Sequence, residues 1–196
     1  MATRLTAVLI VAVSLGGFYL PGLKGALAKE TTRIMAGEVW RLFTVALVHD
    51  GYLHLFFNVS VFLDVGTVVE RLQGSTRMLV VFWCGTAAAS LTSVLFVPQP
   101  AVGASGGVFA LLGALFAVAY GHRRELPPAF RARLVNSTAM VIGANAILGF
   151  VIPRVDWAAH LGGVVAGAVL GGALGLDPAV RKALAQRRGG PGAGAR

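Results

Sequence analysis

Charged side chains and cysteine are both scarce in this chain of 196 residues. Only 13% of the residues are Asp, Glu, Lys or Arg, about half the share of an ordinary soluble domain. The single cysteine, Cys84, excludes an intramolecular disulfide, so helix packing and hydrogen bonds must hold the fold. The shortage of charge, together with 56% hydrophobic residues, excludes a soluble globular protein. It predicts a protein that crosses a membrane several times.

Six apolar runs have about the length needed to cross a membrane. A bilayer core of about 30 Å requires about 20 helical residues. Spanning strands would alternate polar and apolar residues, which these runs do not, so we predict helices. The fold class is therefore all-α, a polytopic membrane bundle of six transmembrane helices over residues 1–180, followed by a basic, Gly-rich, disordered cytoplasmic tail over residues 181–196. The predicted spans are Leu5–Leu20, Tyr52–Val69, Met78–Val97, Val102–Tyr120, Leu134–Ile152 and Trp157–Leu176.

Basic residues are distributed unevenly about these spans. Most of the 17 Lys and Arg residues fall on the side that carries both termini. Positive charge gathers in cytoplasmic loops, so we predict a multi-pass protein of a cell membrane with both termini cytoplasmic. The Ala, Gly and Arg richness favours a bacterial inner membrane. The net charge of +9 then reflects topology and membrane lipids rather than a nucleic acid partner. The basic residues on the opposite side are Lys24, Lys29, Arg33, Arg41 and Arg154.

The first apolar run also has features of a cleavable signal peptide. Arg4 precedes it, and the small-residue sequence Ala26-Leu27-Ala28 follows it. Cleavage would leave five spans and would disturb the charge distribution. We therefore favour an uncleaved first span.

Polar side chains suited to catalysis lie at one depth of the predicted bundle. The second, fourth and sixth spans all run inward from the outer face, and each begins with a polar group. These groups are His54 with Asn58, Ser105, and His160. His54 and Asn58 are four residues apart and share a helix face. Such a pair can simply bond two helices together, but hydroxyl, imidazole and amide groups converging from three spans favour a catalytic site.

Ser105 lies in a glycine-rich turn, Gly103-Ala104-Ser105-Gly106-Gly107, where the fourth span begins. A small hydroxyl there stands beside backbone N–H groups that have no intrahelical partner, and such groups can stabilise an oxyanion. Glycine and serine are also common packing residues between membrane helices, so the motif is weak by itself.

A row of small residues on the sixth span allows another backbone to approach closely, and a row that repeats every four residues on the fourth span is a candidate to meet it. One row comprises His160, Gly163, Gly167 and Gly171, and the other comprises Ser105, Phe109 and Gly113. If the helices meet along these rows, Ser105 and His160 are neighbours. Phe109, one turn below Ser105, then supports the imidazole face.

Two other kinds of site could use these residues. His49, Asp50, His54 and His160 are conceivable zinc ligands on one side of the membrane. No His-Glu-x-x-His motif occurs, and no carboxylate lies at helical spacing within a span near them, so we expect no metal and no other cofactor. A transporter is disfavoured because no inverted repeat is visible. Asp64, the one acidic residue in mid-span, is expected to make a helix contact.

In their order along the chain, these motifs resemble those of the rhomboid family of intramembrane serine proteases. The resemblance covers nearly the whole chain, including six spans and Trp40-Arg41 in the long first loop. Its other motifs are His54-Leu-Phe-Phe-Asn58, Gly103-Ala-Ser105-Gly106 and Ala159-His160-Leu-Gly162-Gly163. It implies the minimal six-span bacterial form.

The resemblance implies a dyad of Ser105 and His160. His54, Asn58 and the Ser105 backbone N–H would then stabilise the oxyanion. We expect supporting roles for Phe109, His49, Gly103 and Gly163, and Glu70 also stands where the family often has a polar residue. Asp156 is expected at a loop edge rather than as a third catalytic residue.

The resemblance also implies transmembrane protein substrates, cleaved near the outer face after small residues. They would enter laterally past the fifth span and the Pro153–Asp156 segment. A silent relative that binds membrane helices as an adaptor or chaperone is the alternative, and the intact Ser105 and His160 disfavour it. The physiological substrate and the oligomeric state are left open.

Overall fold

The computed structural model describes residues 1–151 and 155–189, and the regular elements in these ranges are helices. Six helices of 17 to 24 residues form a bundle. They are α1 (Ala2–Tyr19), α5 (Tyr52–Gln73), α6 (Ser75–Phe96), α7 (Ser105–Gly121), α8 (Pro128–Val151) and α9 (Trp157–Leu174). The long connection from α1 to α5 contains α2 (Pro21–Leu27), α3 (Thr31–Met35), α4 (Arg41–Thr44) and the 3-10 helix η1 (Val45–Leu47), and α10 (Pro178–Gly189) follows the bundle.

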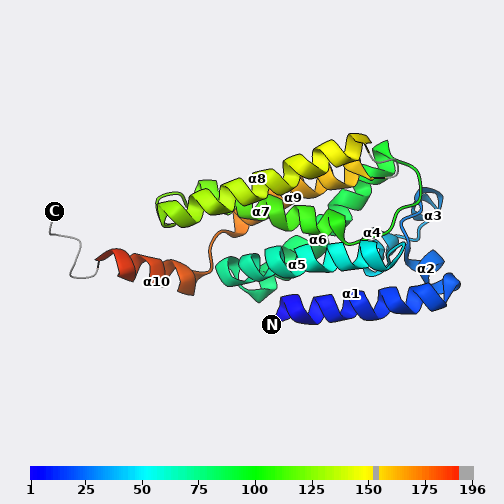
Figure 1. The fold of residues 1–196 in the computed structure, drawn as a ribbon, viewed down its shortest axis with the longest axis horizontal. Coiled ribbons are helices and arrows are strands. Elements are labelled where there is room, and N and C mark those ends of the chain that lie inside the picture. Colours follow the sequence, from blue (N-terminus) through cyan, green and yellow to red (C-terminus); the bar gives the residue numbers. More distant parts are fainter. Residues whose placement is uncertain (152–154, 190–196) are drawn as a thin grey trace.

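Successive long helices run in opposite directions along the bundle (Figure 1). The amino terminus and α10 lie at one end, and α2, α3 and α4 lie at the other. The helices α5, α7 and α9 therefore all begin at the end that carries the short helices. This is the arrangement that brings the polar starts of three spans to one depth.

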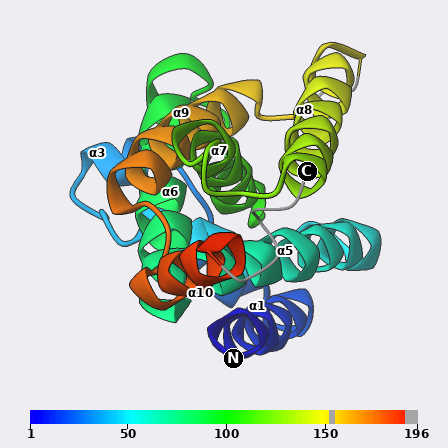
Figure 2. The same cartoon turned by 90° about the vertical axis from the view of Figure 1, so that its left-hand side faces the viewer.

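The central helix of the bundle is α7, which packs against α9, α6, α5 and α8 (Figure 2). Its residues from Gly106 to Leu115 are all buried. Small residues on different faces of α7, among them Gly107 against α6 and Gly113 against α9, let neighbouring helices approach closely, which explains this position. The outer helices carry exposed large hydrophobic residues, among them Val8, Leu53, Leu95 and Val169. Outward apolar faces of this kind suit contact with lipid chains.

Four of the long helices, α1, α5, α6 and α9, are both long enough and apolar enough to cross a membrane. The apolar helix α7 is slightly shorter, with 17 residues. An all-helical membrane protein is thus confirmed over the described ranges. The number of six spans stays a prediction.

Four helix starts differ from the sequence-based expectation, and two of them are slightly early, since α1 begins at Ala2 rather than Leu5 and α6 at Ser75 rather than Met78. The helix α7 starts at Ser105 rather than Val102, because Gly103 has a positive φ of 122° that a helix does not allow. The helix α8 starts at Pro128 rather than Leu134, since proline is well tolerated in the first turn. The predicted end of the fifth span, Ile152, lies outside the described residues.

The expected disorder of the tail from residue 181 is wrong as far as Gly189, because α10 occupies Pro178–Gly189. The Asp177 carboxylate accepts a hydrogen bond from the Ala179 N–H at 2.8 Å, which satisfies a free donor at the helix start. Arg181 is paired with Glu125 at 2.8 Å, which ties α10 to the α7–α8 connection. Residues 190–196 lie outside the described part of the chain.

The first helix is integrated into the fold. It packs on α5 and α6, and Thr3, Ile10 and Ser14 are buried there. The Ser14 hydroxyl donates to the Leu47 carbonyl at 2.9 Å. This packing supports an uncleaved first span, which stays a prediction.

Candidate active site

Ser105 is the first residue of α7, and backbone contacts hold the turn before it. The Gly103 N–H donates to the Val45 carbonyl at 3.0 Å. Two residues earlier, Ala101 exchanges both of its backbone hydrogen bonds with Lys29, each at 3.0 Å. Because Ser105 is the first residue of the helix, its N–H and those of Gly106 and Gly107 have no intrahelical acceptor, and the first intrahelical bond runs from the Val108 N–H to the Ala104 carbonyl. The turn therefore presents a hydroxyl and free donors together.

His160 of α9 lies against this hydroxyl, with 3.0 Å between its Nε2 atom and the Ser105 Oγ. The Phe109 ring stacks on the imidazole, with 4.1 Å between the ring centroids and 15° between the planes. Stacking fixes the orientation of the imidazole, and a neutral His160 can accept the Ser105 proton through Nε2. The structure brings together the three side chains that the sequence pattern places side by side.

Small residues allow α7 and α9 to approach this closely. Three glycines of α9 lie where an added Cβ atom would overlap α7: Gly163, Gly167 and Gly171. On α7 these glycines contact Gly106, Ala110 and Ala114, and Gly163 also meets Phe109. The predicted row lies in the same interface, because a Cβ atom on Gly113 would overlap the Val164 carbonyl of α9. The helices thus meet along the smallest side chains of α7, and Ser105 and Phe109, each one position earlier, reach His160.

The His54 ring lies beside the turn that carries Ser105. A Cβ atom on Gly103 would be 3.0 Å from His54 Nε2, so the ring leaves no room for a side chain at this position. The Asp50 N–H donates to His54 Nδ1 at 3.5 Å, which leaves the proton of a neutral ring on Nε2. The Asn58 amide donates to the His54 carbonyl at 3.0 Å. Among the described hydrogen bonds, neither side chain reaches Ser105.

His49 also contacts the turn that carries Ser105, and its side chain is almost fully buried, at 1% exposure. Its Nε2 accepts the Ala104 N–H at 3.3 Å, so the proton lies on Nδ1, which is 2.8 Å from the Ser14 hydroxyl oxygen. Burial, and to a lesser extent the neighbouring His54 ring, lowers the pKa of His49 to about 3. A neutral His49 therefore links α1 to the residue before Ser105.

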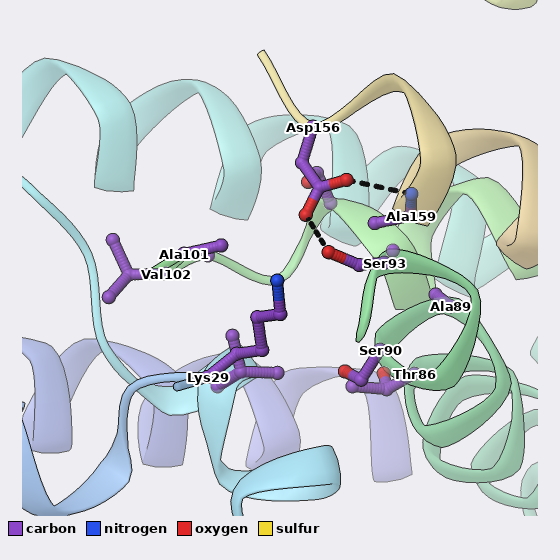
Figure 3. A pocket seen from close by; sticks show the side chains of 13 residues that line it. Lys29, Thr86, Ala89, Ser90, Ser93, Ala101, Val102, Asp156 and Ala159 are labelled. Carbon is purple, nitrogen blue, oxygen red and sulfur yellow. Dashed lines mark hydrogen bonds between the residues drawn. The ribbon is translucent and has the colours of Figure 1, made fainter. Parts of the chain in front are cut away.

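A small cavity of about 30 Å³ adjoins Ser105, and two side chains of opposite charge line it (Figure 3). Asp156 accepts hydrogen bonds from the Ala159 N–H at 2.9 Å and from the Ser93 hydroxyl. The first of these caps the start of α9. The Asp156 carboxylate thus contacts α6 and α9, and no described hydrogen bond joins it to His160.

Lys29 enters this cavity from the long first connection (Figure 3). It is 1% exposed, and its ammonium donates to the carbonyls of Val97 and, at 2.9 Å, Gln99. Burial lowers the pKa of Lys29, and the Asp156 carboxylate opposes that shift. Lys29 thereby fastens the connection between α6 and α7 beside the nucleophile.

Arg41 fastens the segment that carries Lys29. Its Nη1 atom donates to the carbonyls of Gly25 and Ala28, both at 2.7 Å, and its Nε atom donates to Glu38 at 2.6 Å. The side chain is 1% exposed. Trp40 adds a longer bond to the Ala26 carbonyl at 3.4 Å. The pair Trp40-Arg41 therefore has a structural place outside the reacting groups.

Two acidic residues of α5 lie apart from the catalytic candidates. Glu70, near the end of α5, accepts from the Thr3 N–H at 3.0 Å, from the Thr3 hydroxyl at 2.6 Å and from the Ser75 hydroxyl at 2.6 Å. It joins the starts of α1 and α6, far along α5 from His54. Asp64 is exposed on α5, so the expected helix contact is wrong.

Within residues 1–151 and 155–189, no three His, Cys, Asp or Glu side chains are grouped so as to hold a metal ion. His49, a candidate ligand on sequence grounds, is instead bonded to Ala104 and Ser14. The absence of a metal stays an expectation.

The sequence analysis did not single out Lys29 or Ser93. Lys29 was only one of the basic residues in a mixed loop, and Ser93 is one of several small residues on an apolar helix. The burial of Lys29, which is 1% exposed, cannot be read from the neighbouring sequence, because its partners are backbone carbonyls about 70 residues away.

Comparisons with known proteins identify a domain and several similar proteins. The profile of the Rhomboid domain matches residues 36–176, a range that includes His54, Asn58, Ser105 and His160. Rhomboid protease GluP of Bacillus subtilis is 38% identical over 152 residues, which cover 78% of this chain and 29% of that protein. Rhomboid-related protein 2 of Mus musculus is 33% identical over 145 residues, which cover 68% of this chain and 47% of that protein.

The similar proteins also include one whose name marks it as inactive. Inactive RHOMBOID-like protein 8 of Arabidopsis thaliana is 29% identical over 129 residues, which cover 65% of this chain and 36% of that protein. The chain spans less than half the length of these three relatives. Similarity alone therefore identifies the domain, and activity has to be argued from the site.

Proposed function

Because the chain belongs to the rhomboid family, we propose that it is an intramembrane serine endopeptidase that uses Ser105 and His160 to cleave transmembrane segments of other membrane proteins. The observation that carries this proposal is the 3.0 Å contact between Ser105 Oγ and His160 Nε2 at the start of a buried helix. A nucleophile within hydrogen-bond reach of its base is the arrangement that acyl transfer requires.

The reaction begins when His160 takes the Ser105 proton as Oγ attacks the scissile carbonyl carbon. The carbonyl π electrons move to oxygen, and a tetrahedral oxyanion forms. On collapse the C–N bond breaks, and His160 gives the proton to the leaving amine. A water molecule, deprotonated by His160, then hydrolyses the ester and returns the proton to Ser105.

The oxyanion is stabilised by the free backbone N–H of Ser105 and by the side chains of His54 and Asn58. The start of α7 adds the positive end of its helix dipole. His54 suits this role because Nδ1 accepts the Asp50 N–H and leaves Nε2–H as a donor beside Gly103. Asn58 uses one amide hydrogen on the His54 carbonyl and has a second one for the oxyanion.

The same proposal includes a membrane topology and a route of substrate entry for the protein. Residues 1–180 form six spans with both termini in the cytoplasm of a bacterial cell, and residues 181–196 form a cytoplasmic tail. The dyad then lies near the outer face, where water can reach it. Substrate helices enter past α8, unwind locally and are cut after small residues, because an intact helix hides its carbonyls in hydrogen bonds. Part of the segment expected to cap this route, Pro153–Asp156, lies outside the described residues.

Covalent labelling by a fluorophosphonate probe of the detergent-purified protein tests the dyad. We expect labelling of the wild type and its loss in both Ser105→Ala and His160→Ala, because the probe reports a serine activated by a base. Ser90→Ala is the matched control. Ser90 lines the same small cavity, but its hydroxyl donates to the Leu42 carbonyl at 2.9 Å.

Two results would contradict this assignment. Labelling that persists in Ser105→Ala would place the reactive hydroxyl elsewhere. An unlabelled wild type, while an active rhomboid protease labels in parallel, would favour a protein that binds membrane helices without cleaving them, as the similarity to an inactive relative allows.

A further inference from the structure

A second cavity, of about 200 Å³, lies where α7 joins α8. It is at the opposite end of α7 from Ser105, a distance of about 25 Å for a helix of this length. Arg123 and Arg131 line it together with Asn136 and Tyr120, and Ala119 and Val135 provide apolar wall. Nothing in the proteolytic mechanism uses these residues.

The two arginines of this cavity carry uncompensated charge. Glu125 is the one acidic residue between the end of α7 and the middle of α8, and it is bonded to His122 at 3.0 Å and to Arg181 at 2.8 Å. Within the described ranges neither Arg123 nor Arg131 forms an ion pair. Arg123 makes only a long bond to the Tyr120 carbonyl at 3.4 Å. The cavity therefore offers a pair of guanidinium groups to an anion.

We propose that this cavity binds the headgroup of an anionic glycerophospholipid, such as phosphatidylglycerol, from the membrane leaflet at the α10 end of the bundle. A guanidinium group can donate two parallel hydrogen bonds to one phosphate group, so Arg123 and Arg131 are both suited to bind the phosphate of a lipid headgroup. Basic pockets between membrane helices at the headgroup level recognise anionic lipids. Tyr120 is exposed at the same level, where aromatic side chains mark the membrane interface.

The walls of the cavity favour a lipid over a free phosphate ion. Ala132 and Val135 stand beside the arginines and can contact the glycerol and the first methylenes of an acyl chain. A bound headgroup would bridge the connection after α7 to the first turns of α8. The helix α8 packs chiefly on α7, and of its described side chains only Leu134 and Thr138 are buried. The lipid would thus add a fastening to the most weakly held long helix.

The test compares the full-length protein in nanodiscs of phosphatidylcholine alone and of phosphatidylcholine with phosphatidylglycerol. The variant R123Q/R131Q removes both cavity arginines. Its matched control, R124Q/R133Q, removes the same charge from two exposed arginines of the same connection and helix that do not line the cavity. Native mass spectrometry counts retained phosphatidylglycerol, and thermal unfolding gives the Tm gain that this lipid confers.

We expect wild type and R124Q/R133Q to retain phosphatidylglycerol and to gain several degrees in Tm. R123Q/R131Q is expected to bind it about thirty-fold more weakly, since each basic side chain near an anionic surface contributes about a five-fold gain. If the double variant does not fold in phosphatidylcholine, Arg131→Gln alone is expected to show about a five-fold loss.

Equal losses in R123Q/R131Q and R124Q/R133Q would overturn the proposal, because the effect would then be general surface charge. Retention of the full phosphatidylglycerol preference by R123Q/R131Q would also overturn it. Inorganic phosphate is added to the phosphatidylcholine nanodiscs as a third arm. A Tm gain equal to that from the lipid would assign the cavity to free phosphate instead. None of these readouts depends on proteolysis, so the result is independent of the proposed protease function.

Discussion

Replacing Gly103 by alanine is expected to disable Ser105 while the protein stays folded. Gly103 has φ of 122°, and a Cβ atom there would lie 3.0 Å from both Cε1 and Nε2 of His54. Contacts that short force the imidazole or the turn to move. The turn leads within two residues to the nucleophile, so the displacement reaches the reacting atoms.

A matched glycine separates backbone strain from this clash. Gly37 also has a positive φ, 105°, but an added Cβ atom there meets nothing within 4 Å. Holding an alanine in such a conformation costs about 1–3 kcal/mol at either site. For a chain of this length, that lowers Tm by roughly 2–12 °C. Gly103→Ala carries the additional contact with His54, and a misplacement of about 1 Å at a reacting group costs about 100-fold in rate.

The two variants are compared by thermal unfolding and by the rate of fluorophosphonate labelling. We expect both to lose a similar part of their Tm, with labelling slowed about 100-fold in Gly103→Ala and within about three-fold of wild type in Gly37→Ala. Wild-type labelling in Gly103→Ala would refute the reasoning, since the turn would then tolerate a side chain against His54. Equal slowing in both variants would attribute the loss to general destabilisation.

Other predictions concern the groups around Ser105. Lys29→Met should lower Tm by several degrees, because each buried carbonyl left without a donor costs about 1–3 kcal/mol. Lys24→Met removes only an exposed pair with Asp50 and should change Tm little. Equal changes in Tm would show that Lys29 does not hold the α6–α7 connection in place. Asp156→Asn should keep labelling within about five-fold of wild type, since no described hydrogen bond joins the Asp156 carboxylate to the His160 ring and mutation of the base itself costs at least about 100-fold. A loss as large as that of His160→Ala would make Asp156 a third catalytic residue. Burial lowers the pKa of His49 to about 3, so protonation of this ring favours the unfolded chain. The contribution of neutral His49 to the free energy of unfolding is therefore complete above about pH 6.5 and is lost as pH falls toward 3. The Tm of His49→Gln should therefore fall less than that of wild type between about pH 7 and pH 4, and parallel curves would contradict this.

The helical fold was predictable because membrane-spanning helices are visible in a sequence as long apolar runs. The closeness of α7 and α9 was also predictable, because glycine recurs every four residues on α9 and little else than close packing requires it there. The predicted row of α7, with Ser105, Phe109 and Gly113, does face α9. That the neighbouring row, with Gly106, Ala110 and Ala114, lies against the glycines themselves was not predictable, because the two rows are adjacent on the helix.

The surroundings of the dyad were harder to predict than the dyad itself. His54 and His160 stand out because an imidazole inside an apolar run is costly and needs a reason. Lys29 lies in a polar loop, where a lysine is unremarkable by sequence, yet the structure buries it against Gln99 and the α6–α7 connection. Asp64 shows the opposite error, since a carboxylate inside a span predicts a polar contact and this one is exposed.

The contacts that hold the loops around Ser105 share one physical feature. Lys29 and Arg41 donate mainly to backbone carbonyls, and His49 accepts a backbone N–H, so each side chain holds a segment of backbone in place. Loops cannot satisfy their own backbone groups as helices do, and buried donors and acceptors there need such partners. This makes the end of the bundle around Ser105 stiff on the α1, α6 and α9 sides.

The helix α8 has no comparable fastening among its described residues. Of its described side chains, the buried ones are Leu134 and Thr138, and both lie in the half nearer the α7–α8 connection. Few described contacts hold α8 to the rest of the bundle, which agrees with the proposal that substrates enter past it. The lipid proposed at the base of α8 would then act on the same helix. Occupancy of the Arg123–Arg131 cavity is expected to slow cleavage of a transmembrane substrate more than it slows labelling by a small soluble probe.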